Sequence, residues 1–214
     1  MLERIQAVLA QLYDLEPGVD VRAFLCGRDL LAALERDDQA HRGEVLLVLD
    51  DDEGVHVGLY LDPAVLARLD AGHEDLRSVA LATEGVSHFL YLSFRADNAM
   101  QVTQLELELQ AEVDKYATAI LPELRRAELS GNGVGVIRER SRALRERLYE
   151  RASFIDDGST DEGERYRVAH RAAARYAARL EERYVRTGRI EELVAELRRF
   201  YRLGAREKLE RASR

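Results

Sequence analysis

Along most of the chain, apolar residues recur every three or four positions, which is the spacing of an amphipathic helix. Several predicted ends carry the expected residues: Asp62 precedes Pro63 at a start, and Gly188 follows an end. Pro122 is expected to end or kink the helix before it. The pattern predicts helices over residues 2–13, 29–36, 63–70, 74–83, 99–121, 136–153, 161–186 and 189–210.

The segment 105–109 alternates like a strand, but the longer window around it steps by three or four and favours a helix. Two capping-box patterns support the predicted starts of helices. Asn98 with Gln101 is expected to cap the helix over 99–121, and Ser159 with Glu162 the helix over 161–186.

Three short segments are typical of strands. Residues 45–49 are a run of Leu and Val, and residues 55–61 alternate apolar with other side chains, with a polar turn over 50–54 between them. This pattern predicts a β-hairpin. The aromatic and Leu-rich segment 88–94 predicts a third strand. Carboxylates in the turn could hold Mg²⁺, but they are also typical of an exposed hairpin turn.

These elements predict an α+β, mostly helical protein: a small mixed sheet, made of the hairpin plus one strand, with helices, followed by a C-terminal helical bundle. We expect an α+β part over 1–121, ending in the long helix, and a bundle over 122–214, with one continuous domain as the alternative. Apolar residues make up 46% of the 214 positions, enough for a packed core.

The cysteine content and the hydropathy of the chain bear on disulfide bonds and on cellular location. Cys26 is the single cysteine, which excludes a disulfide framework within one chain and predicts a small buried hydrophobic side chain. No segment approaches the roughly 20 apolar residues that cross a bilayer, and the N-terminus lacks an apolar signal core. We therefore expect a cytoplasmic protein without a membrane association.

Charge is unevenly distributed along the chain. The net charge is −8, but residues 165–214 hold 15 basic against 7 acidic residues, a net of +8, so the first 164 residues carry −16. Part of this basic segment is a row at every fourth position of the helix over 161–186. The row consists of Arg167, Arg171, Arg175, Arg179 and Arg183.

The arginine row could contact phosphates by charge alone, without reading a base sequence. It could instead pair internally with Glu106, Glu112 or the acidic loop over 156–164. We favour internal pairing, and therefore expect weak or no binding to nucleic acid. The glycine-rich segment 131–135 departs from the dinucleotide and P-loop spacings, and predicts a loop between helices.

Five acidic and histidine residues are candidates for a divalent metal. Two pairs are spaced by four, which places both members on one helix face, as metal-binding bundles do. The candidates are Glu84, His88, Glu108, Glu112 and His170. The alternative is a set of polar residues at the edge of the apolar stripe, paired with arginines. If His88 begins a strand, it does not share a helix face with Glu84.

No nucleophile motif or structural-zinc spacing accompanies these candidates. We therefore expect a non-enzymatic interaction or regulatory protein that docks to a charged protein partner or forms a homo-oligomer. The first alternative is a metal-dependent enzyme with a Glu/His site between helices, where histidine favours Fe, Mn or Zn over Ca. The second is sequence-independent nucleic-acid binding through the arginine row.

Overall fold

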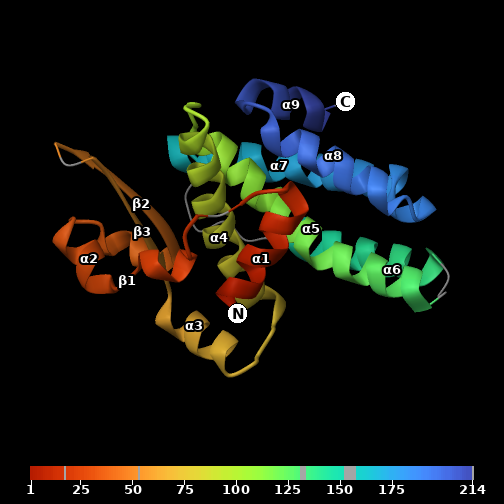
Figure 1. Cartoon of the computed structure of the whole chain (residues 1–214), viewed down its shortest axis with the longest axis horizontal. Helices are drawn as coiled ribbons and strands as arrows, with labels where there is room; N and C mark the ends of the chain where they lie inside the picture. Colours follow the sequence, from red (N-terminus) through yellow and green to blue (C-terminus); the bar gives the residue numbers. More distant parts are fainter. Residues whose placement is uncertain (17, 53, 131–133, 152–157, 214) are drawn as a thin grey trace.

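Helices account for most of the chain, as the three-to-four-residue spacing predicts (Figure 1). The computed structural model describes all residues except 17, 53, 131–133, 152–157 and 214. The α-helices are α1 (Leu2–Tyr13), α2 (Arg28–Ala33), α3 (Pro63–Asp70), α4 (Leu76–Asp97), α5 (Gln104–Ser130), α6 (Val134–Arg145), α7 (Asp161–Arg183), α8 (Ile190–Arg202) and α9 (Ala205–Ser213). The short 3-10 or π turns are η1 (Val21–Phe24), η2 (Asp37–Arg42), η3 (Glu146–Glu150) and η4 (Val185–Thr187).

The predicted hairpin is confirmed. Strands β2 (Glu44–Asp51) and β3 (Gly54–Leu61) pair in antiparallel fashion, with Asp51 opposite Gly54. Gly54 has a φ of 128°, a backbone conformation that L side chains rarely adopt. The third strand is β1 (Leu25–Cys26), which pairs in parallel with β3, so the strand order is β1-β3-β2.

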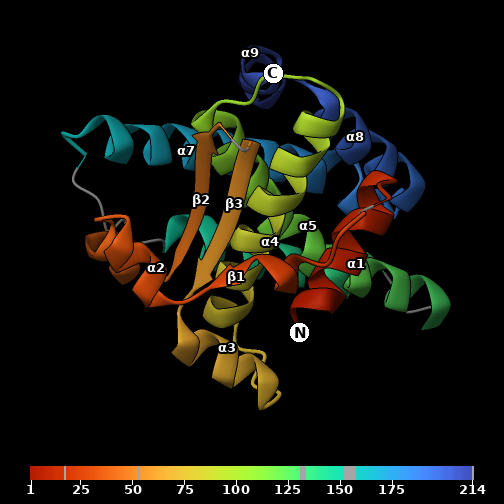
Figure 2. The same ribbon diagram turned by 60° about the vertical axis from the view of Figure 1, so that its left-hand side comes forward.

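The prediction of a strand over 88–94 is wrong, because this segment lies inside α4. An apolar run of that length does not distinguish a strand from a helix buried on several sides. Helix α4 is buried in this way: it packs against α1, α5 and the hairpin strands (Figure 2). Nothing in residues 76–97 interrupts the helix, so the predicted helix over 74–83 and the predicted strand form one element.

The predicted ends of the long helices need correction. Helix α5 continues through Pro122, which lies on an exposed face where the carbonyl deprived of its donor can reach water. Its start is capped by Thr103 and not by Asn98. The Glu106 amide donates to Thr103 Oγ1 at 3.2 Å, and the Thr103 amide donates to Glu106 Oε2 at 2.8 Å, which is a capping box.

Two further corrections concern the C-terminal helices. Thr160, and not Ser159, is the N-cap of α7, since its hydroxyl accepts from the Gly163 amide at 3.0 Å. The single helix expected over 189–210 is two helices, because the chain leaves helical geometry at Leu203 and Gly204 before α9 begins.

One large cluster of buried apolar side chains spans the chain from Leu2 to Ala212, and includes one face of the sheet. A smaller cluster around Leu47 and Tyr60 lies on the other face, under α2 and η2. Helix α5 crosses position 121 without a break. No helix in the described part of the chain is long and apolar enough to span a bilayer.

Two arginines of α8 form hydrogen bonds that connect this helix to α1. Arg198 Nε donates to the Leu12 carbonyl at 2.7 Å, and Arg202 Nη2 donates to the Tyr13 carbonyl at 3.0 Å. Carbonyls at a helix C-terminus lack partners within the helix and carry partial negative charge, so guanidinium groups stabilise this end of α1.

The core position of Leu109 gives a stability prediction. Leu109 is 0% exposed, so Leu109→Ala should lower the free energy of unfolding by about 2–5 kcal/mol through lost burial and a residual cavity. The matched control is Leu129→Ala on the same helix, where the leucine is 89% exposed, and it should change stability by less than about 0.5 kcal/mol. Urea denaturation measures both; equal effects would contradict this packing.

Candidate metal centre

Three of the five metal candidates meet between α4 and α5. Glu84 and His88 lie one turn apart on α4, and Glu108 faces them from α5. Each offers one ligand atom, and these atoms all lie within 4.8 Å of one another. Because 88–94 is helical, His88 shares a helix face with Glu84.

A third carboxylate orients His88. Glu44, the first residue of β2, is buried and accepts a hydrogen bond from His88 Nδ1 at 3.3 Å. The sheet approaches α4 closely here because residue 85 is glycine: a Cβ at that position would lie 3.1 Å from Glu44 Cγ and 3.0 Å from Leu59 Cδ1. Gly85 therefore makes room for the Glu44–His88 contact.

The other ring nitrogen of His88 points at the carboxylates. Nε2 is fully buried, has no hydrogen-bond partner among the described residues, and lies 3.7 Å from Glu108 Oε2. Metal-binding histidines commonly donate one ring N–H to a carboxylate, which leaves the other nitrogen directed at the ion. The Glu44–His88–Glu108 arrangement has this geometry, with Nε2 as the ligand.

Electrostatics within this group reflect an excess of buried negative charge. Burial by itself would lower the pKa of His88, but Glu44, Glu108 and Glu84 together raise it to about 9. Burial raises the pKa of Glu108 to about 8, and the neighbouring carboxylates of Glu84 and Glu44 add to this effect. A cation placed between these side chains would relieve both the burial penalty and the repulsion.

The remaining two candidates, Glu112 and His170, form an adjacent pair. Lys115 connects the two halves: its Nζ lies 2.8 Å from Glu84 Oε2 and 2.7 Å from Glu112 Oε1. Glu112 Oε2 lies 3.0 Å from His170 Nδ1, and His170 Nε2 lies 3.0 Å from the Tyr149 carbonyl. Since both nitrogens of His170 have partners, this pair borders the group of three and does not extend it.

Sequence reasoning missed Glu44 and Lys115. The chain has two lysines against 30 arginines, so each lysine is a compositional exception. The other one, Lys208, is also buried, with Nζ donating to Gln110 and lying 4.1 Å from the Tyr91 ring centroid. Burial lowers the pKa of Lys208, whereas the carboxylates beside Lys115 raise its pKa.

The three side chains fit a metal closely but not perfectly. Two ligands of one ion lie at most about 4.2 Å apart, twice a bond length of about 2.1 Å. The widest pair of ligand atoms, at up to 4.8 Å, would therefore close by about half an ångström. That movement is within the reach of a glutamate rotation. One imidazole and two carboxylates suit Mn, Fe or Zn better than Ca.

The arginine row faces outward for much of its length. Arg171, Arg175 and Arg183 are exposed, and no described carboxylate lies within ion-pair distance of them. Arg167 donates to the Gly163 carbonyl at 3.0 Å, and Arg179 donates to a carbonyl of α9.

Two of the internal partners expected for this row, Glu106 and Glu112, are therefore wrong. Glu106 pairs with Arg95 at 2.8 Å and Glu112 pairs with Lys115, and neither contacts the row. Residues 131–133, most of the glycine-rich segment, lie outside the described residues, as do 156–157 of the acidic loop and Glu53 of the hairpin turn.

Comparison with known proteins gave no match: no family model, no curated protein and no solved structure matches this chain. The interpretation of the Glu84–His88–Glu108 group therefore rests on its own geometry.

Glu112, which borders the Glu84–His88–Glu108 group, gives a prediction about the pH dependence of stability. Burial opposes ionisation of Glu112, but Lys115 and His170 lower its pKa to about 2. A carboxylate whose pKa is lowered by folding stabilises the protein above its usual range near pH 4.5, and this contribution is lost as the pH falls toward 2. The contribution is about 3 kcal/mol, since one pKa unit corresponds to about 1.4 kcal/mol.

Glu112→Gln tests this. The unmodified chain should be more stable than the variant near pH 7, and the gap should narrow as the pH falls below about 4.5. Glu191→Gln, at an exposed position in the first turn of α8, is the matched control and should show a gap of less than about 1 kcal/mol at any pH, from the helix dipole alone. Urea denaturation at several pH values measures both, and a gap for Glu112→Gln that is independent of pH would contradict the assignment.

Proposed function

We propose that this protein binds one divalent transition-metal ion through Glu84, His88 and Glu108, with Glu44 orienting the histidine. The observation that carries the proposal is the buried Nε2 of His88, which has no hydrogen-bond partner among the described residues and is aimed at carboxylates within 4.8 Å. A cluster of acidic residues alone would not indicate a metal. An imidazole nitrogen that lacks a hydrogen-bond partner in the same place does, because such a nitrogen is costly to bury.

The cost of burying these charged groups supports a functional role for them. Burying like charges costs several kcal/mol for each ion, and well-packed apolar residues at the same positions serve stability as well or better. Here three glutamates surround one histidine, and the nearest other cation, Lys115, is shared with Glu112. A bound ion would take the place of the protons on Glu108 and His88, whose pKa values of about 8 and 9 keep both groups protonated near pH 7.

The ligand number favours a catalytic over a structural metal. Structural zinc sites are closed by four protein ligands, whereas catalytic sites use about three and leave a position for water or substrate. Three side chains meet here, and one of them, Glu84, is partly exposed. Metal-dependent catalysis is therefore the function class that we propose. The ion would act as a Lewis acid or activate a bound water.

Metal binding is tested directly with Co²⁺, Zn²⁺ and Mn²⁺. Isothermal titration should show one ion per chain, and Co²⁺ should give visible absorption bands on binding. His88→Ala and Glu108→Gln should each weaken binding by about 100-fold or more, since each removes a ligand. Glu44→Gln should weaken it by about 10–100-fold, the usual effect of removing a partner that orients a ligand.

Two matched histidine controls sharpen the test. His56→Ala, on the exposed hairpin, and His170→Ala, beside Glu112, should leave metal affinity within about threefold, because neither supplies a ligand. Circular dichroism confirms that each variant is folded. Absence of binding in the unmodified chain, or equal binding by His88→Ala, would contradict the proposal.

A further inference from the structure

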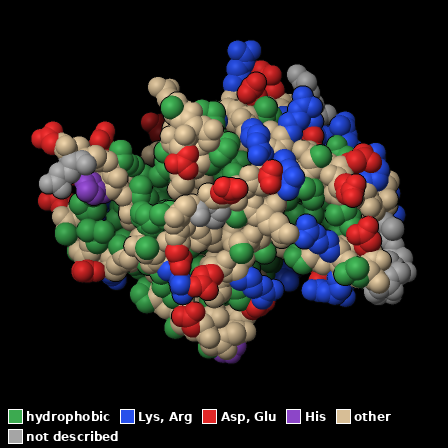
Figure 3. Space-filling model, viewed as in Figure 1, with side chains coloured by type: hydrophobic (Ala, Val, Ile, Leu, Met, Phe, Trp, Pro, Cys, Tyr) green, Lys and Arg blue, Asp and Glu red, His purple; other side chains and the backbone are tan. Residues whose placement is uncertain are grey.

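Exposed apolar side chains gather beside the hairpin. Val19, Val48 and Val55 are 48%, 42% and 65% exposed, and they account for three of the six large exposed hydrophobic side chains in the described chain. Val48 and Val55 lie on the face of the hairpin that is directed toward α4. Figure 3 shows hydrophobic side chains gathered over the hairpin and beside α4. Exposed apolar patches of this kind mark binding surfaces.

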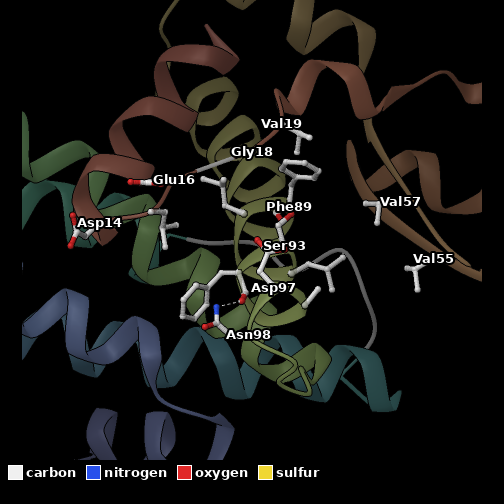
Figure 4. A pocket seen from close by; sticks show the side chains of 15 residues that line it. Asp14, Glu16, Gly18, Val19, Val55, Val57, Phe89, Ser93, Asp97 and Asn98 are labelled. Atoms are coloured by element: carbon white, nitrogen blue, oxygen red, sulfur yellow. Dashed lines mark hydrogen bonds between the residues drawn. The ribbon is translucent and has the colours of Figure 1, made fainter.

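Two of these residues, Val19 and Val55, line a groove of about 540 Å³. Phe89 and Leu92 of α4 contribute one side, and Val55 and Val57 of β3 contribute the other (Figure 4). The segment between α1 and η1 closes one end, with Val19 among its lining residues. The groove is distinct from the proposed metal centre, whose residues do not line it.

The groove runs beside an open strand edge. Strand β1 pairs with β3 at Leu59 and Tyr60 alone, so the outer edge of β3 over 54–58 has no neighbouring strand among the described residues. The exposed N–H and C=O groups of such an edge accept an added strand. Five residues of extended chain cover about 17 Å, at about 3.3 Å per residue.

The charges around the groove indicate which kind of molecule it binds. Asp14, Glu16 and Asp97 are exposed along it, and no Lys or Arg is among its described lining residues. A second copy of this chain, pairing edge to edge about a twofold axis, would bring two such acidic rims together, which costs binding energy. A segment with basic side chains does not incur that repulsion.

We propose that this groove binds an extended segment of a partner protein whose groove-facing side chains, at every second position, are apolar in the middle and basic at the ends, and that the segment adds as a strand to the open edge of β3. Its apolar side chains pack on Val55, Val57 and Leu92, and its terminal basic side chains, on the same face of the strand, approach Glu16 and Asp97. Main-chain hydrogen bonds to β3 supply affinity, and the acidic rim supplies selectivity for basic sequences.

The probe is a fluorescent heptapeptide, Arg-Ser-Val-Ser-Val-Ser-Arg, acetylated and amidated at its ends, in which both arginines and both valines lie on one face of the extended strand. Fluorescence anisotropy at 150 mM salt should show binding to the unmodified chain. The same peptide, N-methylated at all five central residues, keeps its charge but loses hydrogen bonds along both edges of the strand, and should bind at least tenfold more weakly. A peptide with glutamate in place of arginine should not bind detectably.

Matched variants locate the site. Val55→Lys should weaken binding at least tenfold, whereas Val136→Lys should not change it, since Val136 lies on α6 and is also exposed, at 54% against 65% for Val55. The pair Glu16→Lys and Asp97→Lys should also weaken binding at least tenfold. Glu164→Lys with Glu191→Lys makes the same change in net charge elsewhere on the surface and should have less than a threefold effect.

Three outcomes would overturn the proposal. Equal binding of the N-methylated peptide would exclude strand addition. Equal weakening by both pairs of charge reversals would mean that the peptide responds to net charge alone. Self-association detected by light scattering, and abolished by Val55→Lys, would assign the groove to a second copy of the chain.

Discussion

The fold is organised around a central helix that buries charge. Helix α5 packs against α4, α6, α7, α8 and α9, so it has almost no solvent-facing side over its first half. Yet every second residue from 106 to 114 is polar, and each is buried or nearly so. A buried polar group without a partner costs about 1–3 kcal/mol, and more if it is charged. The neighbours of α5 must therefore supply a partner at each of these positions.

The partners come from all parts of the chain. They are Arg95 for Glu106, His88 for Glu108, Lys208 for Gln110, Lys115 with His170 for Glu112, and Tyr13 with Ser87 for Asp114. Four of these positions have hydrogen-bonded partners. At Glu108 the nearest partner is His88 Nε2, at a distance of 3.7 Å and without a hydrogen bond. Glu108 therefore differs from the other four polar positions, which all have hydrogen-bonded partners. A buried polar group without such a partner is expected at functional sites.

The same constraint explains what could be predicted from the sequence. The hairpin, α1 and α3 have one face toward solvent, so their apolar spacing identifies them. The alternation of polar residues in α5 resembles a strand over 105–109, and the apolar run of α4 resembles a strand over 88–94. Both helices are buried on several sides and expose no broad polar face to solvent. Buried helices lose the periodicity on which sequence prediction depends.

The candidate site was partly predictable for a related reason. Spacings of four identified Glu84 with His88, and Glu108 with Glu112, because helix geometry is local. Glu44 is 40 residues from Glu84 along the chain, and no local pattern links them. Lys115 carried a compositional signal, since lysine is rare in this chain and arginine serves almost everywhere else. A compact ammonium fits between two carboxylates in a narrow space where a planar guanidinium does not.

The candidate metal centre and the groove depend on one packing contact. His88 and Phe89 are consecutive on α4, so the centre and the groove lie on adjoining faces of that helix. The distance between α4 and the sheet is set at Gly85, where a Cβ would lie within 3.2 Å of Glu44, Leu59 and Leu61 side chains. A larger residue there would push the sheet away from α4. That displacement would lengthen the Glu44–His88 hydrogen bond and widen the groove between α4 and β3 together, so one glycine fixes the geometry of both.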